Sequence, residues 1–276
     1  MKLKISKSRM NIIKRFIFQQ GRLIERKYYQ YFFEHGSPED CVAVIRAYQN
    51  RDGGFGNGIE PDILCPDSSG IGMETAFYYL DMLELPDQNI IDKAVSWLLC
   101  TLNPDGSLPH PPQHMAAYPH QPWWNNPDTP RILSIVSYLK KWDIACDELY
   151  EKVRPFTDIC ALPHPLAFYD YPYYLYLKYF PRSEVREIQW KQVNVVLPEL
   201  IEKEPLHYPL IGRHWYLALD NFSNGERDQQ IQHWLDGLQE DGGLEILYKD
   251  LPWWRPIWTL DGLMVMKKFA LVEFEE

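Results

Sequence analysis

Residues 47–55 (AYQNRDGGF) end one helical pattern with a Gln, an Asp and two glycines, and this combination recurs along the chain. Residues 236–244 read DGLQEDGGL, and residues 99–108 (LCTLNPDGSL) form a partial copy without the Gln and the second Gly. A glycine directly after a helix adopts a positive φ without the penalty of a Cβ, and the preceding Asp can accept from free backbone N–H groups. Each copy therefore predicts a helix end, a tight turn, a Pro-rich loop and a second helix.

Apolar residues have helical periodicity almost everywhere around these turns. In the first segment Met10, Ile13, Ile17 and Ile24 recur at steps of three, four and seven residues. The same pattern predicts helices over residues 38–49, 71–84, 88–101, 128–141, 145–159, 165–180, 184–203, 208–220, 226–238 and 255–272. The first segment adds one helix, or two if it breaks near Gly21. Because strand alternation is scarce and no linker stands out, we expect one all-α domain over residues 1–276.

The composition is that of a globular protein with an excess of rings. Apolar residues make up 46% of the 276 residues and charged residues 24%, which excludes a disordered chain, a collagen-like repeat and a multi-span membrane protein. The chain also contains 12 Phe, 10 Trp and 18 Tyr. So many rings predict either thick side-chain layers or an aromatic-lined cavity.

Charge is spread unevenly along the chain. Residues 1–27 hold nine of the 28 Lys and Arg residues and a single acid, Glu25, whereas the whole chain has a net charge of −10. The acidic remainder argues against nucleic-acid binding, which needs a basic surface to neutralise phosphates. The basic helical segment, residues 1–34, has two interpretations: a docked first helix with a basic polar side, or a peripheral contact with an anionic membrane.

The cysteines and the apolar runs favour a cytoplasmic protein. The five cysteines include no C-x-x-C pair, and reduced, buried thiols explain them best. We find no signal peptide and no run of about 18 apolar residues.

The repeated turns resemble a known superfamily. Residues 49–55 and 239–244 resemble the Gln-Asp-Gly-aromatic repeat of squalene–hopene cyclase-type enzymes, whose turn also occurs in protein prenyltransferase β-subunits. Residues 53–68 (GGFGNGIEPDILCPDS) are similar to bacterial proteins assigned to the same superfamily. The resemblance implies an α/α toroid of about six helix pairs around a central cavity. It also implies a hydrophobic, isoprenoid-like ligand, with no cofactor expected here.

Acid chemistry in this superfamily depends on aspartates that this sequence only partly supplies. Cyclases protonate an alkene or epoxide with an Asp-x-Asp-Asp motif, which is absent, and the nearest look-alike is the single Asp128. Its alternative role is the N-cap of the following helix, as Asp67 or Ser68 could cap the helix near 71. Other candidate catalytic carboxylates lie beside the glycine-rich turn: Glu60, Asp62, Asp67 and, further along, Glu74. Paired carboxylates next to aromatic rings are equally typical of glycoside hydrolysis.

Metal chemistry has little support in the sequence. The Asp-Asp-x-x-Asp cluster that binds Mg²⁺ with diphosphate is absent, and Asp62 with Cys65 lacks the spacing of the prenyltransferase zinc site. Three histidines, His110, His114 and His120, fall in one Pro-rich loop. Since an extended loop does not force its rings to converge, we expect polar groups at a rim, with His114 as a ligand contact, and no bound metal.

Aromatic residues are the strongest candidates for ligand binding. Two tryptophan pairs follow Pro-rich loops, Trp123 with Trp124 and Trp253 with Trp254, and Tyr171 lies in a Tyr-rich segment. Their faces could stabilise a carbocation, stack on sugars or line a lipid tunnel. The sequence therefore favours a protein of the cyclase or prenyltransferase type that binds a small hydrophobic molecule. A carbohydrate-active hydrolase or lyase on the same fold and a non-catalytic binding module are the alternatives.

Overall fold

The computed structural model describes residues 2–84, 86–203, 211–213, 215–246 and 248–275. Helices dominate these residues, so the prediction of an all-α protein is confirmed. The chain forms two compact units: a terminal unit, Met1–Val44 with Asn194–Glu276, and a middle unit, Ile45–Val193. Two helices, α3 (Pro38–Arg46) and α9 (Glu184–Lys203), run across the boundaries between them. The single domain over residues 1–276 stays a prediction.

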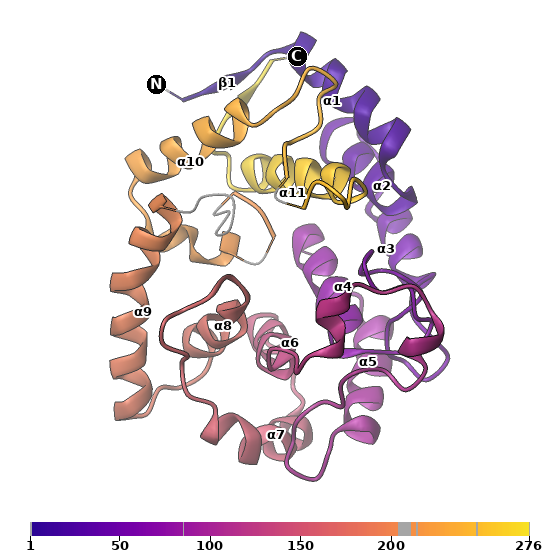
Figure 1. Cartoon of the computed structure of the whole chain (residues 1–276), viewed down its shortest axis with the longest axis vertical. Coiled ribbons are helices and arrows are strands. Elements are labelled where there is room, and N and C mark those ends of the chain that lie inside the picture. Colours follow the sequence, from indigo (N-terminus) through magenta and orange to yellow (C-terminus); the bar gives the residue numbers. More distant parts are fainter. Residues whose placement is uncertain (1, 85, 204–210, 214, 247, 276) are drawn as a thin grey trace. The chain divides into compact units, whose positions relative to one another are not determined.

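The middle unit has its helices in two layers. Its α-helices are α4 (Gly70–Leu83), α5 (Gln88–Thr101), α6 (Arg131–Lys141), α7 (Asp147–Ile159) and α8 (Tyr171–Tyr179). Short 3₁₀ helices stand before α6 and α8, namely η1 (Met115–Ala117), η2 (Pro122–Asn125) and η3 (Phe168–Asp170). The helices α4, α6 and α8 pack in a row, with α5 and α7 on their outer side (Figure 1). Every residue of α4 is buried, whereas α5 buries one face, as an inner and an outer helix should.

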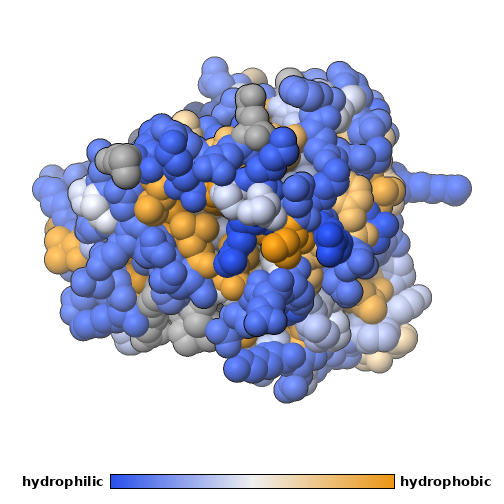
Figure 2. All heavy atoms as spheres, turned by 90° about the horizontal axis from the view of Figure 1, so that it is seen from above, coloured by the Kyte–Doolittle hydropathy of each residue, from blue (hydrophilic) through white to orange (hydrophobic). Residues whose placement is uncertain are grey.

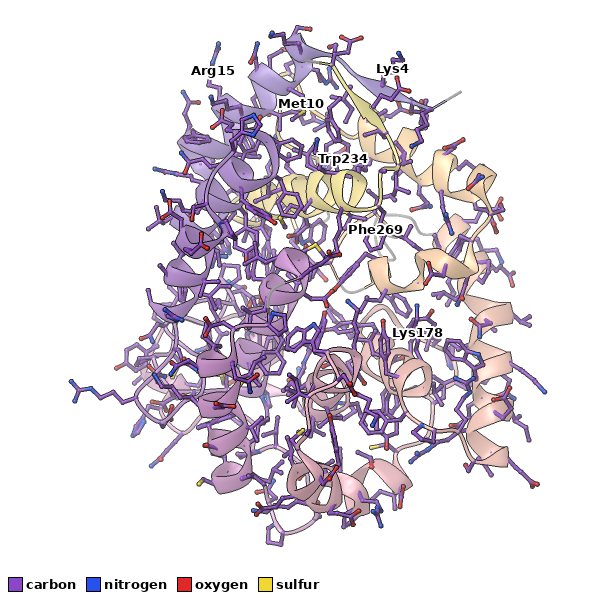
Figure 3. The ribbon with its side chains drawn as sticks, turned by 180° about the vertical axis from the view of Figure 1, so that it is seen from behind. Lys4, Met10, Arg15, Lys178, Trp234 and Phe269 are labelled. Atoms are coloured by element: carbon purple, nitrogen blue, oxygen red, sulfur yellow. The ribbon has the colours of Figure 1, made fainter. Side chains whose placement is uncertain are left out.

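The terminal unit is built around one buried helix. It contains α1 (Lys7–Gln20), α2 (Leu23–Phe33), η4 (Trp215–Asn221), α10 (Asn224–Asp236) and α11 (Trp254–Lys268). Both α1 and α2 pack against α11, and the first helical segment breaks at Gly21, the second of the two possibilities that the sequence left open. Trp234 of α10 lies beside α11 at Gly262, where a Cβ would come within 2.1 Å of the indole Nε1 (Figure 3).

One parallel strand pair joins the two ends of the terminal unit. Strands β1 (Lys4–Ile5) and β2 (Glu273–Phe274) pair Lys4 with Glu273 and Ile5 with Phe274. Strands of two residues are too short to produce an alternating pattern in the sequence, so they were not predicted.

The three glycine turns share one hydrogen-bond pattern. The expected positive φ is confirmed at Gly53 (97°), Gly106 (88°) and Gly242 (90°). In each turn the Asp before the glycine accepts from the backbone N–H two residues on, at 2.9 to 3.0 Å. Gln49 braces the first turn, because its Nε2 donates to the carbonyl of Gly53 and to that of Ile90 in α5.

Replacing Gly53 with Ala should destabilise the protein by about 2 kcal/mol, because a Cβ at this positive φ is strained. The new Cβ would also lie 2.2 Å from the carbonyl oxygen of Lys93. Urea denaturation measures the loss. Gly225→Ala is the control, since its Cβ would meet only Ser223 Oγ at 3.9 Å. A Gly53→Ala protein as stable as the native chain would contradict this role for the turn.

Several predicted helix boundaries are wrong. Ser69, not Asp67 or Ser68, caps α4, with its Oγ accepting from the N–H of Gly72. Pro130 stands at the N-cap of α6, so Asp128 is not the cap. Within 165–180 the α-helix covers only Tyr171–Tyr179. Of the helix expected over 208–220, residues 208–210 and 214 lie outside the described residues, and Trp215–Asn221 is a 3₁₀ helix.

Most Lys and Arg side chains of the basic N-terminal segment form ion pairs or hydrogen bonds within the terminal unit. Lys4 pairs with Glu273, Lys14 with Glu34 and Lys27 with Asp40. Lys2, Arg9 and Arg26 donate to backbone carbonyls, and Arg22 binds Glu25. Arg15 is exposed and projects away from α1 (Figure 3). These contacts attach the segment to the rest of the terminal unit.

One face of the molecule carries mainly polar residues (Figure 2), and the cysteines differ in their exposure. The face drawn in Figure 2 is mostly hydrophilic, with hydrophobic residues showing in separate patches. In the described part of the chain, none of the helices combines the length and the apolar character that a membrane crossing requires. All five cysteines are free thiols; Cys41 and Cys65 are buried as expected, whereas Cys100 is exposed.

Candidate active site

Two loops of the middle unit meet at the N-terminal ends of the inner helices. One precedes α4 and the other precedes α6. The Leu64 N–H donates to the Pro119 carbonyl and the Gln121 N–H to the Asp62 carbonyl, each at 2.9 Å. This junction gathers most of the residues predicted from the sequence: Glu60, Asp62, Asp67, His114, Trp123, Trp124 and Asp128.

Asp62 is a buried carboxyl held by tryptophans. Its side chain is 5% exposed, and its Oδ1 accepts a hydrogen bond of 2.9 Å from the indole Nε1 of Trp124. The neighbouring Trp123 also favours the charged form of this carboxyl. The two members of the pair differ in exposure, since Trp123 is 39% exposed and Trp124 only 6%. Asp62 is thus buried next to a ring that reaches the surface.

Burial raises the pKa of Asp62 to about 6, because removal from water penalises the charged carboxylate. The hydrogen bond from Trp124, the nearby indole of Trp123 and the positive charge of Arg131 act in the opposite direction but do not cancel it. A carboxyl of this pKa is present in both protonation states near neutral pH. That is the property required of a general acid or base.

Glu60 and Asp67 line a small pocket, together with Ile63, the residue that follows Asp62. Glu60 is 8% exposed, and its Oε2 accepts a 2.8 Å hydrogen bond from the hydroxyl of Thr75 in α4. The pocket has about 10 Å³ of free space, room for roughly one water molecule. At its edge Asp67 Oδ2 lies 2.9 Å from both the backbone N and the Nδ1 of His114. His114 therefore bridges the two loops, in keeping with the rim position expected for it.

Asp128 belongs to a buried ion-pair cluster. Both its carboxylate oxygens accept from Arg131, the first residue of α6. Arg131 Nη1 lies 2.9 Å from Glu74 Oε2 in α4 and also donates to the hydroxyl of Tyr171, the first residue of α8. Glu74 in turn accepts from Tyr171 and from Ser134. One guanidinium thus links the starts of all three inner helices.

Burial of this cluster shifts the pKa values of its titratable side chains. Burial raises the pKa of Glu74 above its ordinary value, against the charge of Arg131 and the hydroxyls of Ser134 and Tyr171. Burial also raises the pKa of Tyr171 well above 10. Since Asp128 is held bidentately by Arg131, it is a structural partner of that side chain and a poorer candidate proton donor than Asp62.

The remaining predicted residues fall elsewhere. Trp253 and Trp254 belong to the terminal unit, where Trp253 is 41% exposed and Trp254 packs with Ile246, Leu251 and Ile257. Tyr171 is 1% exposed within the ion-pair cluster, and its ligand contact stays a prediction.

The histidines of the Pro-rich loop bind separate partners. His110 Nε2 is 2.9 Å from the Trp124 carbonyl, and His120 Nδ1 is 2.8 Å from the Tyr118 carbonyl. Across the described residues, no group of three or more His, Cys, Asp or Glu side chains could hold a metal ion.

Sequence reasoning missed Arg131, Ser134 and Thr75. The available signal was Arg131 itself, which is the only charged residue among the first nine of α6 (RILSIVSYL) and stands three residues after Asp128. A single cation in an apolar helix is stable only when it pairs with a buried anion.

Comparisons with protein-family models, curated proteins and solved structures found no match to this chain.

Proposed function

We propose that this chain binds a hydrophobic, isoprenoid-like molecule against its exposed tryptophans and that Asp62 donates a proton to it. The observation that carries the proposal is the Asp62 carboxyl, which is buried, hydrogen-bonded to Trp124, next to the exposed Trp123 and has a pKa of about 6. The resemblance to cyclases and prenyltransferases in the glycine turns supports the ligand class.

The acidity of Asp62 favours an oxygen as the proton acceptor. An acid of pKa near 6 is well matched to neutral pH but too weak to protonate an unactivated alkene readily. An epoxide oxygen is more basic, and opening of its strained ring accompanies the transfer. We therefore propose an epoxidised isoprenoid as the substrate class.

The step conserves atoms and charge. The O–H bond of Asp62 breaks and an O–H bond forms on the epoxide oxygen. The adjacent C–O bond breaks, its electron pair stays on oxygen, and the carbon becomes cationic. A C=C electron pair of the same molecule then attacks this carbon, and loss of a proton to the Asp62 carboxylate regenerates the acid. The ring face of Trp123 offers the cation a favourable electrostatic contact.

A glycosidic oxygen is the second candidate acceptor. It is favoured by Glu60, a second buried carboxylate two residues from Asp62, because glycoside hydrolysis uses two carboxyl groups. This alternative predicts turnover of aryl glycosides and none of epoxides.

The helix arrangement suggests the larger architecture. The row of inner helices in the middle unit and the shared hydrogen bonds of the three turns support an α/α toroid made of helix pairs. We also propose a cytoplasmic location without a cofactor, from the thiol content and the sequence pattern, and a docked rather than membrane-bound N-terminal segment.

The test is incubation of the purified chain with epoxyfarnesol and, separately, with a set of aryl glycosides. We expect cyclised or ring-opened alcohol from the epoxide, detected by gas chromatography with mass spectrometry. The rate should fall about tenfold per pH unit above pH 6, as the protonated fraction of Asp62 declines. Asp62→Asn is the negative control. Failure of the native chain to bind or convert any epoxidised isoprenoid overturns the proposal.

A further inference from the structure

We infer that Trp124 is the positioning residue that orients the Asp62 carboxyl and holds its proton on Oδ2. The inference rests on the proposed function, because it matters only if Asp62 is the proton donor. It concerns a ring that is itself buried and does not reach the substrate.

The first support is the direction of the hydrogen bond. The indole Nε1 of Trp124 can only donate, and it donates to Asp62 Oδ1 at 2.9 Å. Since a carbonyl oxygen accepts better than a hydroxyl oxygen, the neutral carboxyl is most stable with Oδ1 as its carbonyl. The acidic hydrogen then resides on Oδ2. A proton fixed on one oxygen is one requirement of a general acid with defined geometry.

The second support is that Trp124 is held on every side. Its carbonyl lies 2.9 Å from His110 Nε2, and its ring packs in an apolar cluster with Ile63, Cys65, Ile71 and Met115. The Arg131 guanidinium lies over the ring, 6.0 Å from its centre. The indole is therefore anchored by the buried cluster at the start of α6.

The third support is that the backbone of Asp62 is fixed by the same loop. The N–H of Gln121, three residues before Trp124, donates to the Asp62 carbonyl at 2.9 Å. The side chain and the main chain of Asp62 are thus both bound by residues 121–124. The charged residues and histidines of the two loops and of α6 are Arg51, Asp52, Glu60, Asp67, Asp105, His110, His114, His120, Asp128, Arg131, Lys140 and Lys141. Of these, Arg131 favours the ionised Asp62 carboxyl through its charge, as the indole of Trp123 also does, whereas the 2.9 Å hydrogen bond to Oδ1 comes from Trp124.

The experiment follows the Asp62 carboxyl by ¹³C NMR in the full chain without substrate. Trp124→Phe keeps a ring over Arg131 but removes the N–H. Because a hydrogen bond to a charged group is lost, we expect the Asp62 titration midpoint to rise by about 1 pH unit. The matched control is Trp142→Phe, which removes another indole–carboxylate hydrogen bond of the middle unit, that of Trp142 to Asp81 at 2.9 Å. It should leave the midpoint of Asp62 unchanged.

A second measurement uses the native sequence, so the test does not depend on the folding of Trp124→Phe. The indole ¹H–¹⁵N signal of Trp124 should shift with pH at the same midpoint as Asp62 and lose this shift in Asp62→Asn. An Asp62 midpoint unaffected by Trp124→Phe, or an indole signal that does not respond between pH 4 and 8, overturns the inference. Absence of turnover with intact NMR behaviour counts against the proposed function alone.

Discussion

The Arg131→Met protein is expected to lose about 3 to 5 kcal/mol of folding stability at pH 7, because breaking a buried ion pair leaves uncompensated charges. Arg131 is 7% exposed and Glu74 is fully buried, so water cannot replace the lost guanidinium. Tyr171 and Asp128 lose the same donor. Urea denaturation of the native and variant chains measures the difference.

The loss of folding stability in Arg131→Met should be smaller at low pH than at pH 7. Removing Arg131 takes away the charge that lowers the pKa of Glu74, so the pKa of this carboxyl rises further. Its protonation at low pH then relieves the buried charge, and we expect the stability deficit to shrink as the pH falls. The double variant with Glu74→Gln should recover part of the stability at pH 7.

A matched surface pair serves as the control. Arg154 and Glu151 form an ion pair whose side chains are 58% and 63% exposed. Arg154→Met should therefore change stability by less than about 1 kcal/mol. An Arg131→Met protein that is no less stable than the Arg154→Met protein would contradict the role assigned to the buried cluster.

Replacing Asp62 with Asn should lower turnover of the epoxide by about 10²- to 10⁴-fold, the usual contribution of a general acid. The same change should stabilise the fold at pH 8 by about 3 kcal/mol, since the pKa of Asp62 is raised from 3.8 to about 6. In the folded state this carboxyl binds its proton more tightly than in the unfolded chain. The native protein therefore loses stability as the pH rises from about 4 to 6, and Asn, which stays neutral, does not.

The comparison is made by urea denaturation at pH 4 and pH 8. The two proteins should be similarly stable at pH 4, with the gain of Asp62→Asn appearing only at the higher pH. Asp105→Asn is the control, because hydrogen bonds from Ser107 lower rather than raise the pKa of that exposed carboxyl, and it should give no gain. Reduced stability of Asp62→Asn at pH 8 would mean that the carboxylate is not held in an unfavourable environment.

Local structure was predictable where one residue type dictates a conformation. Gly53, Gly106 and Gly242 take up a positive φ because a residue with a Cβ is strained there, and Gly21 ends the first helix where the apolar pattern pauses. The site was predictable only as a list of residues. Asp62 and Trp124 are 62 positions apart, and their local sequences do not predict the hydrogen bond between them.

The roles within that list depend on tertiary packing. Asp128 and Asp62 are both carboxylates before a helix, yet Arg131 binds the first, whereas removal from water raises the pKa of the second. Likewise Trp123 and Trp124 are adjacent in sequence but differ in exposure, because only the second packs against Ile63 and Met115. Such differences arise from which surfaces the fold brings together, which local propensity does not encode.

The most direct test of the account is the titration of the Asp62 carboxyl itself. In the folded native chain, the ¹³C resonance that disappears in Asp62→Asn should be followed from pH 3 to pH 8. We expect a midpoint near pH 6, where Asp62 can both give up and regain a proton. A midpoint near the ordinary aspartate value of about 3.9 would contradict it, because an Asp62 ionised throughout the neutral range could not act as the acid.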